Sequence, residues 1–150
     1  MKPATKQKPE HARRRARRSA MQALYQWQMA KQNLADIEEQ FRVDQDMSKV
    51  DLDYFHELLH QIPAHMDELD TALGPHADRD ISAIDPVERA ILRIGIYELK
   101  FRPEIPYRVV LNEAIQLAKQ FGAEDGHKYI NGILDKLAHE LRGIEINAGL

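Results

Sequence analysis

An arginine-rich segment near the amino terminus is the strongest chemical feature of this sequence. It contains Arg13, Arg14, Arg15, Arg17 and Arg18. Each guanidinium is permanently charged and can bind two phosphate oxygens at once. On a helix, Arg13 lines up with Arg17, and Arg14 with Arg18, in adjacent rows that could follow a nucleic-acid backbone. A solvated helix start, or contact with an anionic membrane or protein, is the alternative. Stacked cations at a helix amino terminus are unfavourable without an anionic partner, so we expect nucleic acid.

The charge is distributed unevenly along the chain of 150 residues, although its net value is only −3. Residues 1–18 carry eight basic side chains and one acid, Glu10, whereas residues 36–85 carry fourteen carboxylates and three basic side chains. An acidic body repels a nucleic acid while the basic end attracts it. The pattern therefore predicts a localised contact with a polyanion.

A second motif, His56-Glu57-Leu58-Leu59-His60, matches the zincin pattern of two histidines one helical turn apart with a glutamate between them. Such a site needs a third ligand, but Pro63 and Met66 stand where a metzincin has its glycine and third histidine. Cys is absent, which excludes zinc-thiolate sites. We therefore expect no metal site here and interpret the two histidines as a partly exposed helix shoulder, with a zinc hydrolase as the weaker alternative.

Lys128 and Tyr129 lie off the apolar stripe of their predicted helix, where a cation and a ring could contact an unpaired base. An interfacial tyrosine beside a solvated lysine is the ordinary alternative. Glu98 lies inside an apolar arc and is best explained as a buried acid with a basic partner. Gly132 in mid-helix predicts a close helix approach. The sequence has no glycine-rich phosphate loop and no nucleophile with a base, so we expect no catalytic residue and no cofactor.

The elements that carry these residues are all predicted to be helices, because apolar residues recur at helical spacing and no segment alternates with the period of a strand. The segment 86–101 is apolar nearly all round and should be a central buried helix. We expect an all-α domain of six or seven helices over residues 12–150, behind a flexible basic tail at residues 1–11. The predicted helix caps are Asn33, Ser48 with Asp51, Asp85 and Asp125.

The chain has no apolar run long enough for a signal peptide or a membrane span. The lack of cysteine suits a reducing compartment. We therefore expect a soluble, cytoplasmic protein with no membrane contact.

Eight short segments follow one another in a distinctive order and spacing from about Lys2 to Leu141. They are Ala12–Arg17, Gln22–Tyr25, Val87–Ile94, Tyr97–Leu99, Asn112–Ile115, Leu117–Lys119, Phe121-Gly122 and Tyr129–Lys136. Together they resemble the NusB family of bacterial transcription antitermination proteins, and the last segment is the most specific. The resemblance implies an all-α fold of two packed helical sub-bundles around the helix at 86–101.

The resemblance also implies partners. A NusB-like protein would bind the boxA sequence of single-stranded nascent RNA together with NusE, a ribosomal protein. It would help to assemble an antitermination complex on RNA polymerase and support rRNA transcription. A homodimer of the free protein is compatible with this expectation.

Particular residues match the functional positions of the family. Arg13, Arg14 and Arg17 match its RNA-contacting motif; Asp125, Lys128 and Tyr129 match a second RNA-facing patch; Tyr25 and Glu88 match positions that meet the protein partner. The sequence departs from the family pattern in a longer amino-terminal tail, in Arg18 where an acid is frequent, and in Tyr129 where phenylalanine is common. Both side chains preserve charge attraction and stacking, so Arg18 stays among the expected RNA contacts.

The alternative function is a stand-alone RNA-binding accessory domain, related to the helical domain that is fused to rRNA cytosine methyltransferases. We expect no methyl transfer, because the sequence lacks cysteine and ends at Leu150 without a methyl-donor domain.

Overall fold

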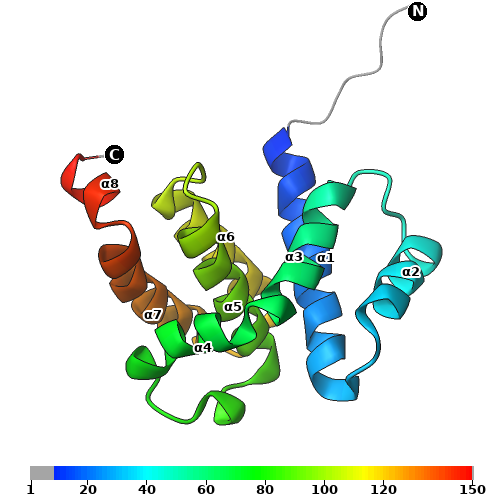
Figure 1. Ribbon diagram of the computed structural model, residues 1–150, viewed down its shortest axis with the longest axis horizontal. Coiled ribbons are helices and arrows are strands. Elements are labelled where there is room, and N and C mark those ends of the chain that lie inside the picture. The colour runs from blue at the N-terminus through cyan, green and yellow to red at the C-terminus, as the bar shows by residue number, and fades with distance from the viewer. Residues whose placement is uncertain (1–8, 150) are drawn as a thin grey trace, which may run out of the picture. The chain divides into compact units, whose positions relative to one another are not determined.

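The computed structural model describes residues 9–149, and all the regular structure in that range is helical (Figure 1). The α-helices are α1 (Pro9–Ala30), α2 (Leu34–Asp44), α3 (Leu52–Ala64), α4 (Met66–Leu73), α5 (Pro86–Phe101), α6 (Tyr107–Phe121), α7 (Gly126–Leu141) and α8 (Gly143–Asn147). Two 3-10 helices, η1 (Gly74–His76) and η2 (Ile81–Ala83), precede α5. The all-α prediction is confirmed, and α8 is the helix that the sequence analysis missed.

The first helix begins earlier than expected. Residues 1–8 of the expected tail lie outside the described residues, but residues 9–11 are already helical. Proline is well suited to the first turn of a helix because its missing N–H needs no partner there, and Glu10 in that turn favours the helix dipole. The tail boundary at residue 11 is therefore wrong by three residues.

The chain divides into two compact units, one ending at Gln61 and the other beginning at Ile62. In the first unit, α1 buries small side chains such as Ala16 and Ala20, while Phe41 of α2 meets Phe55 of α3 edge to face, with ring centroids 5.7 Å apart. Two units agree with the two sub-bundles that the family resemblance implies.

Local capping explains where the helices of the first unit begin. Asn33 accepts hydrogen bonds from the N–H groups of Ala35 and Asp36, as predicted. Asp51 caps α3 without help from Ser48: its carboxylate accepts a hydrogen bond from the N–H of Tyr54 at 3.0 Å. The predicted role of Ser48 is wrong: it lies in the preceding turn, where its N–H donates to Asp46.

In the second unit, α5 is the most buried helix, with every residue from Ala90 to Leu99 buried against α6, α7 and α4. Asp85 caps it as predicted, accepting from the N–H groups of Val87 and Glu88. Glu98 is buried, also as expected.

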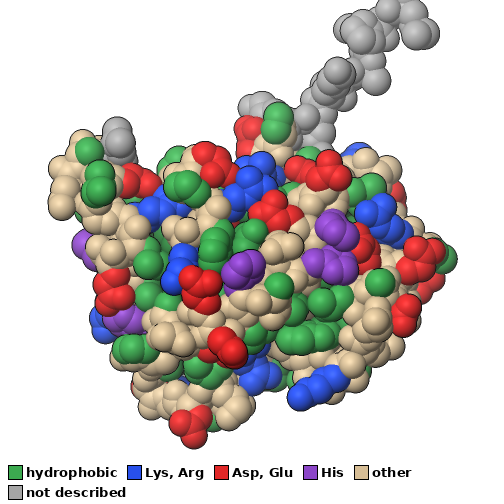
Figure 2. All heavy atoms as spheres, in the orientation of Figure 1, with side chains coloured by type: hydrophobic (Ala, Val, Ile, Leu, Met, Phe, Trp, Pro, Cys, Tyr) green, Lys and Arg blue, Asp and Glu red, His purple; other side chains and the backbone are tan. Residues whose placement is uncertain are grey.

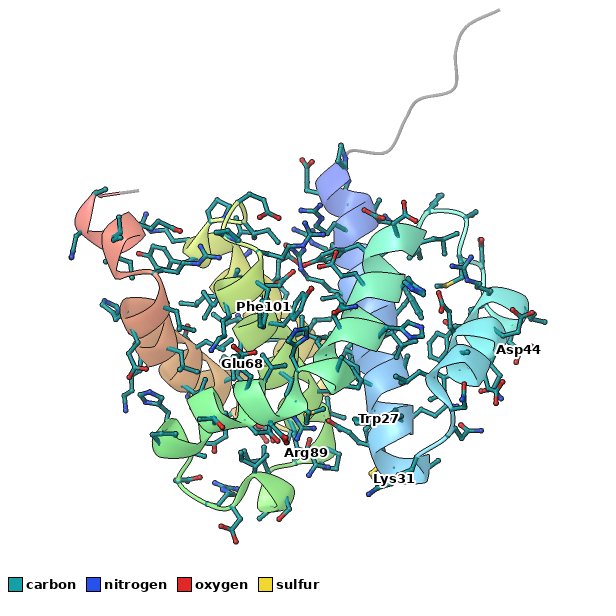
Figure 3. The ribbon with its side chains drawn as sticks, viewed as in Figure 1. Trp27, Lys31, Asp44, Glu68, Arg89 and Phe101 are labelled. Carbon is teal, nitrogen blue, oxygen red and sulfur yellow. The ribbon has the colours of Figure 1, made fainter. Side chains whose placement is uncertain are left out.

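Two ion pairs join α4 to α5 within this unit. Arg93 lies 2.8 Å from Asp70, and Lys100 lies 3.2 Å from Glu68. Figure 3 labels Glu68 on α4 and Phe101 at the end of α5. These pairs complement the apolar contacts that hold α4 on the second unit.

The close helix approach occurs at Gly95 and not at Gly132. A Cβ at Gly95 would stand 2.8 Å from Cδ1 of Leu134, so any larger residue would force the buried Leu134 side chain of α7 to move. Gly132 is exposed and has no neighbour within 4 Å of such an atom. The prediction of a close approach at Gly132 is therefore wrong, because helical periodicity alone does not show which face is covered.

The buried guanidinium of Arg142 holds the end of α5 and the start of α8. It donates to the carbonyl oxygens of four residues, and it pairs with Glu145 at 2.6 Å. The four acceptors are Glu98, Leu99, Arg102 and Ile105. The other carboxylate oxygen of Glu145 accepts from the N–H of Tyr107 at the start of α6. The carbonyl groups of Glu98 and Arg102 also accept backbone N–H groups, so this one side chain adds further hydrogen bonds at the end of α5.

Across residues 9–149, no helix is both long enough and apolar enough to cross a membrane.

Candidate nucleic-acid and partner interface

The arginines of α1 form two rows with different surroundings. Arg14 and Arg18 are exposed. In the other row, the Cζ atoms of Arg13 and Arg17 lie 4.7 Å and 5.7 Å from the ring centroid of Tyr54, a buried side chain of α3. A guanidinium over an aromatic face is stabilised by the ring quadrupole. One row is therefore anchored on an aromatic ring and the other faces outward.

This arrangement corrects the expectation for Arg17. Its side chain is only 3% exposed, so it has no open face for a phosphate in this structure. Its charge still adds to the positive potential of α1, since a buried charge is weakly screened. Sequence reasoning missed Tyr54, which has no local signal because it is separated from the arginines by more than thirty residues.

The second expected patch lies at the start of α7. Asp125 and Lys128 are both exposed, and their charged groups lie 3.3 Å apart. The backbone of Asp125 is left-handed, with φ of 66°, and its side chain accepts no capping hydrogen bond. The prediction of Asp125 as a side-chain cap is therefore wrong, and its carboxylate instead forms an exposed ion pair with Lys128.

Tyr129 is held by two residues that precede α5. Its hydroxyl donates to Asp78 at 3.1 Å, and the Cζ of Arg79 lies 5.2 Å from its ring centroid. Asp78 and Arg79 are themselves paired, with an N···O distance of 2.6 Å. The sequence analysis did not single out Asp78 or Arg79, because two adjacent opposite charges in a loop are common.

The electrostatics of this cluster favour a neutral tyrosine next to a carboxylate. The hydrogen bond from Arg79, with a smaller contribution from Tyr129, lowers the pKa of Asp78 to about 2. Burial raises the pKa of Tyr129, and its hydrogen bond to the Asp78 carboxylate raises it further. The phenol ring is thus fixed in orientation, with a cation over it.

The two residues expected to meet a protein partner lie in different units. Tyr25 on α1 is 39% exposed, and Met29, one turn further on, is 58% exposed. This exposed pair lies near the end of α1, where Figure 3 labels Trp27 and Lys31. An exposed aromatic and an exposed methionine on one helix face suit a protein contact.

Glu88 is half-buried in the first turn of α5 and lies against the start of α7. A Cβ at Gly126 would stand 2.5 Å from its Oε1. Burial raises the pKa of Glu88 and the nearby charge of Asp85 adds to the effect, while Arg79 opposes it. The expected partner contact therefore adjoins the second RNA patch at Gly126.

The histidine motif of α3 is not isolated. Nδ1 of His56 and Nε2 of His60 lie 2.9 Å and 2.8 Å from carboxylate oxygens of Glu38 on α2. Burial of Glu38 raises its pKa, but the hydrogen bonds from His56, His60 and Arg42 outweigh burial and lower it to about 2. The two histidines remain on a helix shoulder, as expected, but they share an acidic partner that the sequence did not reveal.

Comparison with known proteins decides the family. The model of the NusB family matches residues 14–139, which is most of the chain. The chain belongs to the NusB family. Relatives named transcription antitermination protein NusB include one from Pseudomonas fluorescens, 55% identical over 149 residues, covering 98% of this chain and 90% of the relative. Another from Nitrosococcus oceani is 57% identical over 136 residues and covers 91% of each chain.

Solved structures agree with this NusB assignment. T. maritima NusB superimposes with a TM-score of 0.74 at 28% identity, covering 91% of this chain and 94% of the other. A NusB in a complex of the antitermination factors NusB and NusE with dsRNA has a TM-score of 0.69 at 25% identity, covering 83% and 93%. The relatives are transcription antitermination proteins, so the expectation that this NusB protein acts by binding and not by catalysis is confirmed.

Proposed function

We propose that this protein is a cytoplasmic transcription antitermination factor that binds boxA-type single-stranded RNA together with the ribosomal protein NusE. It would help to assemble an antitermination complex on RNA polymerase and thereby support rRNA transcription. The observation that carries this proposal is the nearly full-length match to NusB proteins, one of which was solved with NusE and dsRNA.

The two patches described above have the chemistry to bind RNA. Arg13, Arg14 and Arg18 offer charges to phosphates, while Lys128 and Tyr129 offer a cation and a ring to an unpaired base. Asp125 would act through its ion pair with Lys128. Arg17 would act by adding to the positive potential of α1. Phosphate contacts fix the position of the RNA, and stacking adds selectivity for unpaired bases.

Partner binding would use two further features. The half-buried carboxylate of Glu88 suits a basic ribosomal protein, and the exposed Tyr25 and Met29 offer apolar area. The same apolar pair is also the surface on which a homodimer of the free protein would form. Sedimentation of the free protein, before and after the change Met29→Ser, tests the homodimer separately.

The decisive experiment titrates RNA with and without NusE, and NusE with and without RNA. If the two ligands bind cooperatively, each must raise the affinity for the other by the same factor. The RNA probes are single-stranded boxA, a scrambled single strand and a duplex. The proposal is supported if RNA and NusE each raise the affinity for the other and if boxA binds more tightly than the scrambled strand. Independent binding of the two ligands, or equal affinity for boxA and the scrambled strand, contradicts it, and a preference for the duplex contradicts its single-stranded part.

A further inference from the structure

The described residues contain one group of three side chains that could hold a metal ion together: Glu38, His56 and His60. The two histidines stand one turn apart on α3, with ring centroids 4.2 Å apart. Glu38 reaches them from α2, and one ligand atom from each of the three residues lies within 4.8 Å of the others. Figure 2 shows a pair of histidine side chains at the surface beside an acidic side chain.

The third ligand that the sequence motif lacked is thus supplied by a different helix. A zinc site requires ligands about 2.0–2.2 Å from the ion, which places tetrahedral ligand atoms roughly 3.3–3.5 Å from one another. The nitrogens already lie 2.9 Å and 2.8 Å from Glu38 oxygens, so a small outward rotation of the side chains would make room for an ion. Two imidazoles and one carboxylate are a donor set that zinc and related ions prefer.

We propose that Glu38, His56 and His60 form a binding site for a divalent transition-metal ion, of which Zn²⁺ is the reference case. All three side chains belong to the first unit, so a bound ion would join α2 to α3 within it. A ligand that binds only the folded state stabilises that state. The site is therefore expected to raise the stability of the first unit, and this inference replaces the expectation that the two histidines form only a helix shoulder.

The burial pattern suits a ligand set that is partly ordered in advance. Glu38 is only 8% exposed, so its carboxylate is held in place, and the side chain of His60 is 26% exposed. The side chain of His56 is 57% exposed, which leaves an approach for the ion from solvent. Three protein ligands leave a fourth coordination position for water.

One neighbour opposes metal binding. Arg42 donates to Oε2 of Glu38 at 3.1 Å, and its positive charge would repel a cation. Its side chain is 42% exposed, so it can turn into solvent when an ion binds. Because Arg42 competes with the ion for Glu38, removing the Arg42 side chain should strengthen metal binding.

Other histidines of the described chain provide matched controls. His139 lies near Asp135 and His76 near Glu140, and each pair lacks a third ligand among the described residues. A weak, general affinity of surface histidines for metal would involve these pairs as much as the proposed site. The site itself should be more selective, because three converging ligands hold an ion far better than two.

The test uses the full chain without a histidine tag, stripped of metal, and titrates it with Zn²⁺ by calorimetry and with Co²⁺ by absorption. We expect one equivalent with micromolar or tighter affinity, a tetrahedral Co²⁺ spectrum and a higher Tm with Zn²⁺. Glu38→Gln and His60→Ala should each weaken binding at least tenfold, His139→Ala should leave it unchanged, and Arg42→Ala should tighten it.

Circular dichroism establishes whether each variant folds. Should His60→Ala unfold, His60→Gln and Glu38→Gln carry the test, since both retain side-chain volume. Absence of saturable binding in the micromolar range would overturn the proposal. So would affinities that are equal for wild type, Glu38→Gln and the His60 variant.

Discussion

Gly126 lies directly against the carboxylate of Glu88, so closely that a single methyl group on Gly126 would stand 2.5 Å from Oε1. Gly126 opens the helix that carries Lys128 and Tyr129, and Glu88 opens α5. The residue expected to meet NusE and the patch expected to meet RNA therefore adjoin one another in the second unit. This adjacency offers a physical route for coupling between the two ligands.

Changing Glu88 to lysine should weaken NusE binding by about 2 kcal/mol or more, because a half-buried carboxylate that pairs with a basic protein would become a repelling cation. Gly126→Ala should also weaken it, since the added methyl group displaces the Glu88 carboxylate without changing any charge. Calorimetry with NusE measures both, and Gly132→Ala, on the exposed face of the same helix, is the control. Unchanged NusE affinity in folded Glu88→Lys would eliminate Glu88 as a contact.

Substitutions in the two arginine rows should have different effects: those in the exposed row should change RNA affinity, and those in the row over Tyr54 should change fold stability. The double change Arg14→Ala with Arg18→Ala should lower RNA affinity and flatten its salt dependence. The log–log slope is expected near −2 to −3 for three or four phosphates and should lose about 0.7 for each phosphate contact removed. Arg17→Ala should instead lower the midpoint of urea unfolding, because its guanidinium is buried near Tyr54. A slope that is the same in wild type and the double variant contradicts this division of roles.

Tyr129 should act through its ring and not through its hydroxyl. Tyr129→Ala should reduce affinity for single-stranded RNA by about 1–3 kcal/mol, which is the usual effect of losing one stacked base. Tyr129→Phe removes the hydrogen bond to Asp78 but keeps the ring, so its affinity should stay within a few-fold of wild type. Filter binding or fluorescence anisotropy distinguishes the two variants, and equal losses in both would show that the hydroxyl is the important group.

Arg142 should be important for stability and not for binding. Arg142→Met removes five hydrogen bonds of a largely buried network, four to carbonyl oxygens and one to the Glu145 carboxylate, so unfolding should become easier by about 3 kcal/mol or more. The exposed Arg108 is the matched control, and Arg108→Met should change stability by no more than about 0.5 kcal/mol. Urea denaturation followed by circular dichroism measures both. Equal stability of the two variants would mean that the buried network contributes nothing.

The pH dependence of folding stability should show the raised pKa of Glu88. Its folded-state pKa is raised above the ordinary 4.5 by burial and by Asp85, so the folded protein binds the proton more tightly than the unfolded chain. Stability is then lost as the pH rises from about 4.5 through the folded-state pKa, and the loss persists at neutral pH. Glu88→Gln removes this penalty, so the variant should gain stability relative to wild type as the pH rises from 4 to 7. A constant difference across that range would contradict the assignment.

Much of the fold could be predicted from local sequence. Apolar residues at helical spacing predicted the helices, and Asn33 and Asp85 were recognised as caps because a cap depends only on the next three residues. The family was also evident from sequence, since its segments keep their order and spacing. Short-range rules failed where two residues could each cap the same helix, since Asp51 caps α3 and Ser48 does not. They also failed where the packing partner of a helix face matters, since the close helix approach is at Gly95 and not at Gly132.

The functional surface was decided largely by tertiary structure. The sequence named the arginines, but only the packing of Tyr54 showed that Arg17 is buried while Arg14 and Arg18 face outward. The partners of Tyr129 lie about fifty residues before it, and Glu38 lies about twenty residues before its two histidines. Side-chain charge and helical period are properties of a few neighbouring residues, and the sequence determined those. Which distant side chains meet depends on how whole helices pack, because burial is a property of the assembled core and not of any single segment.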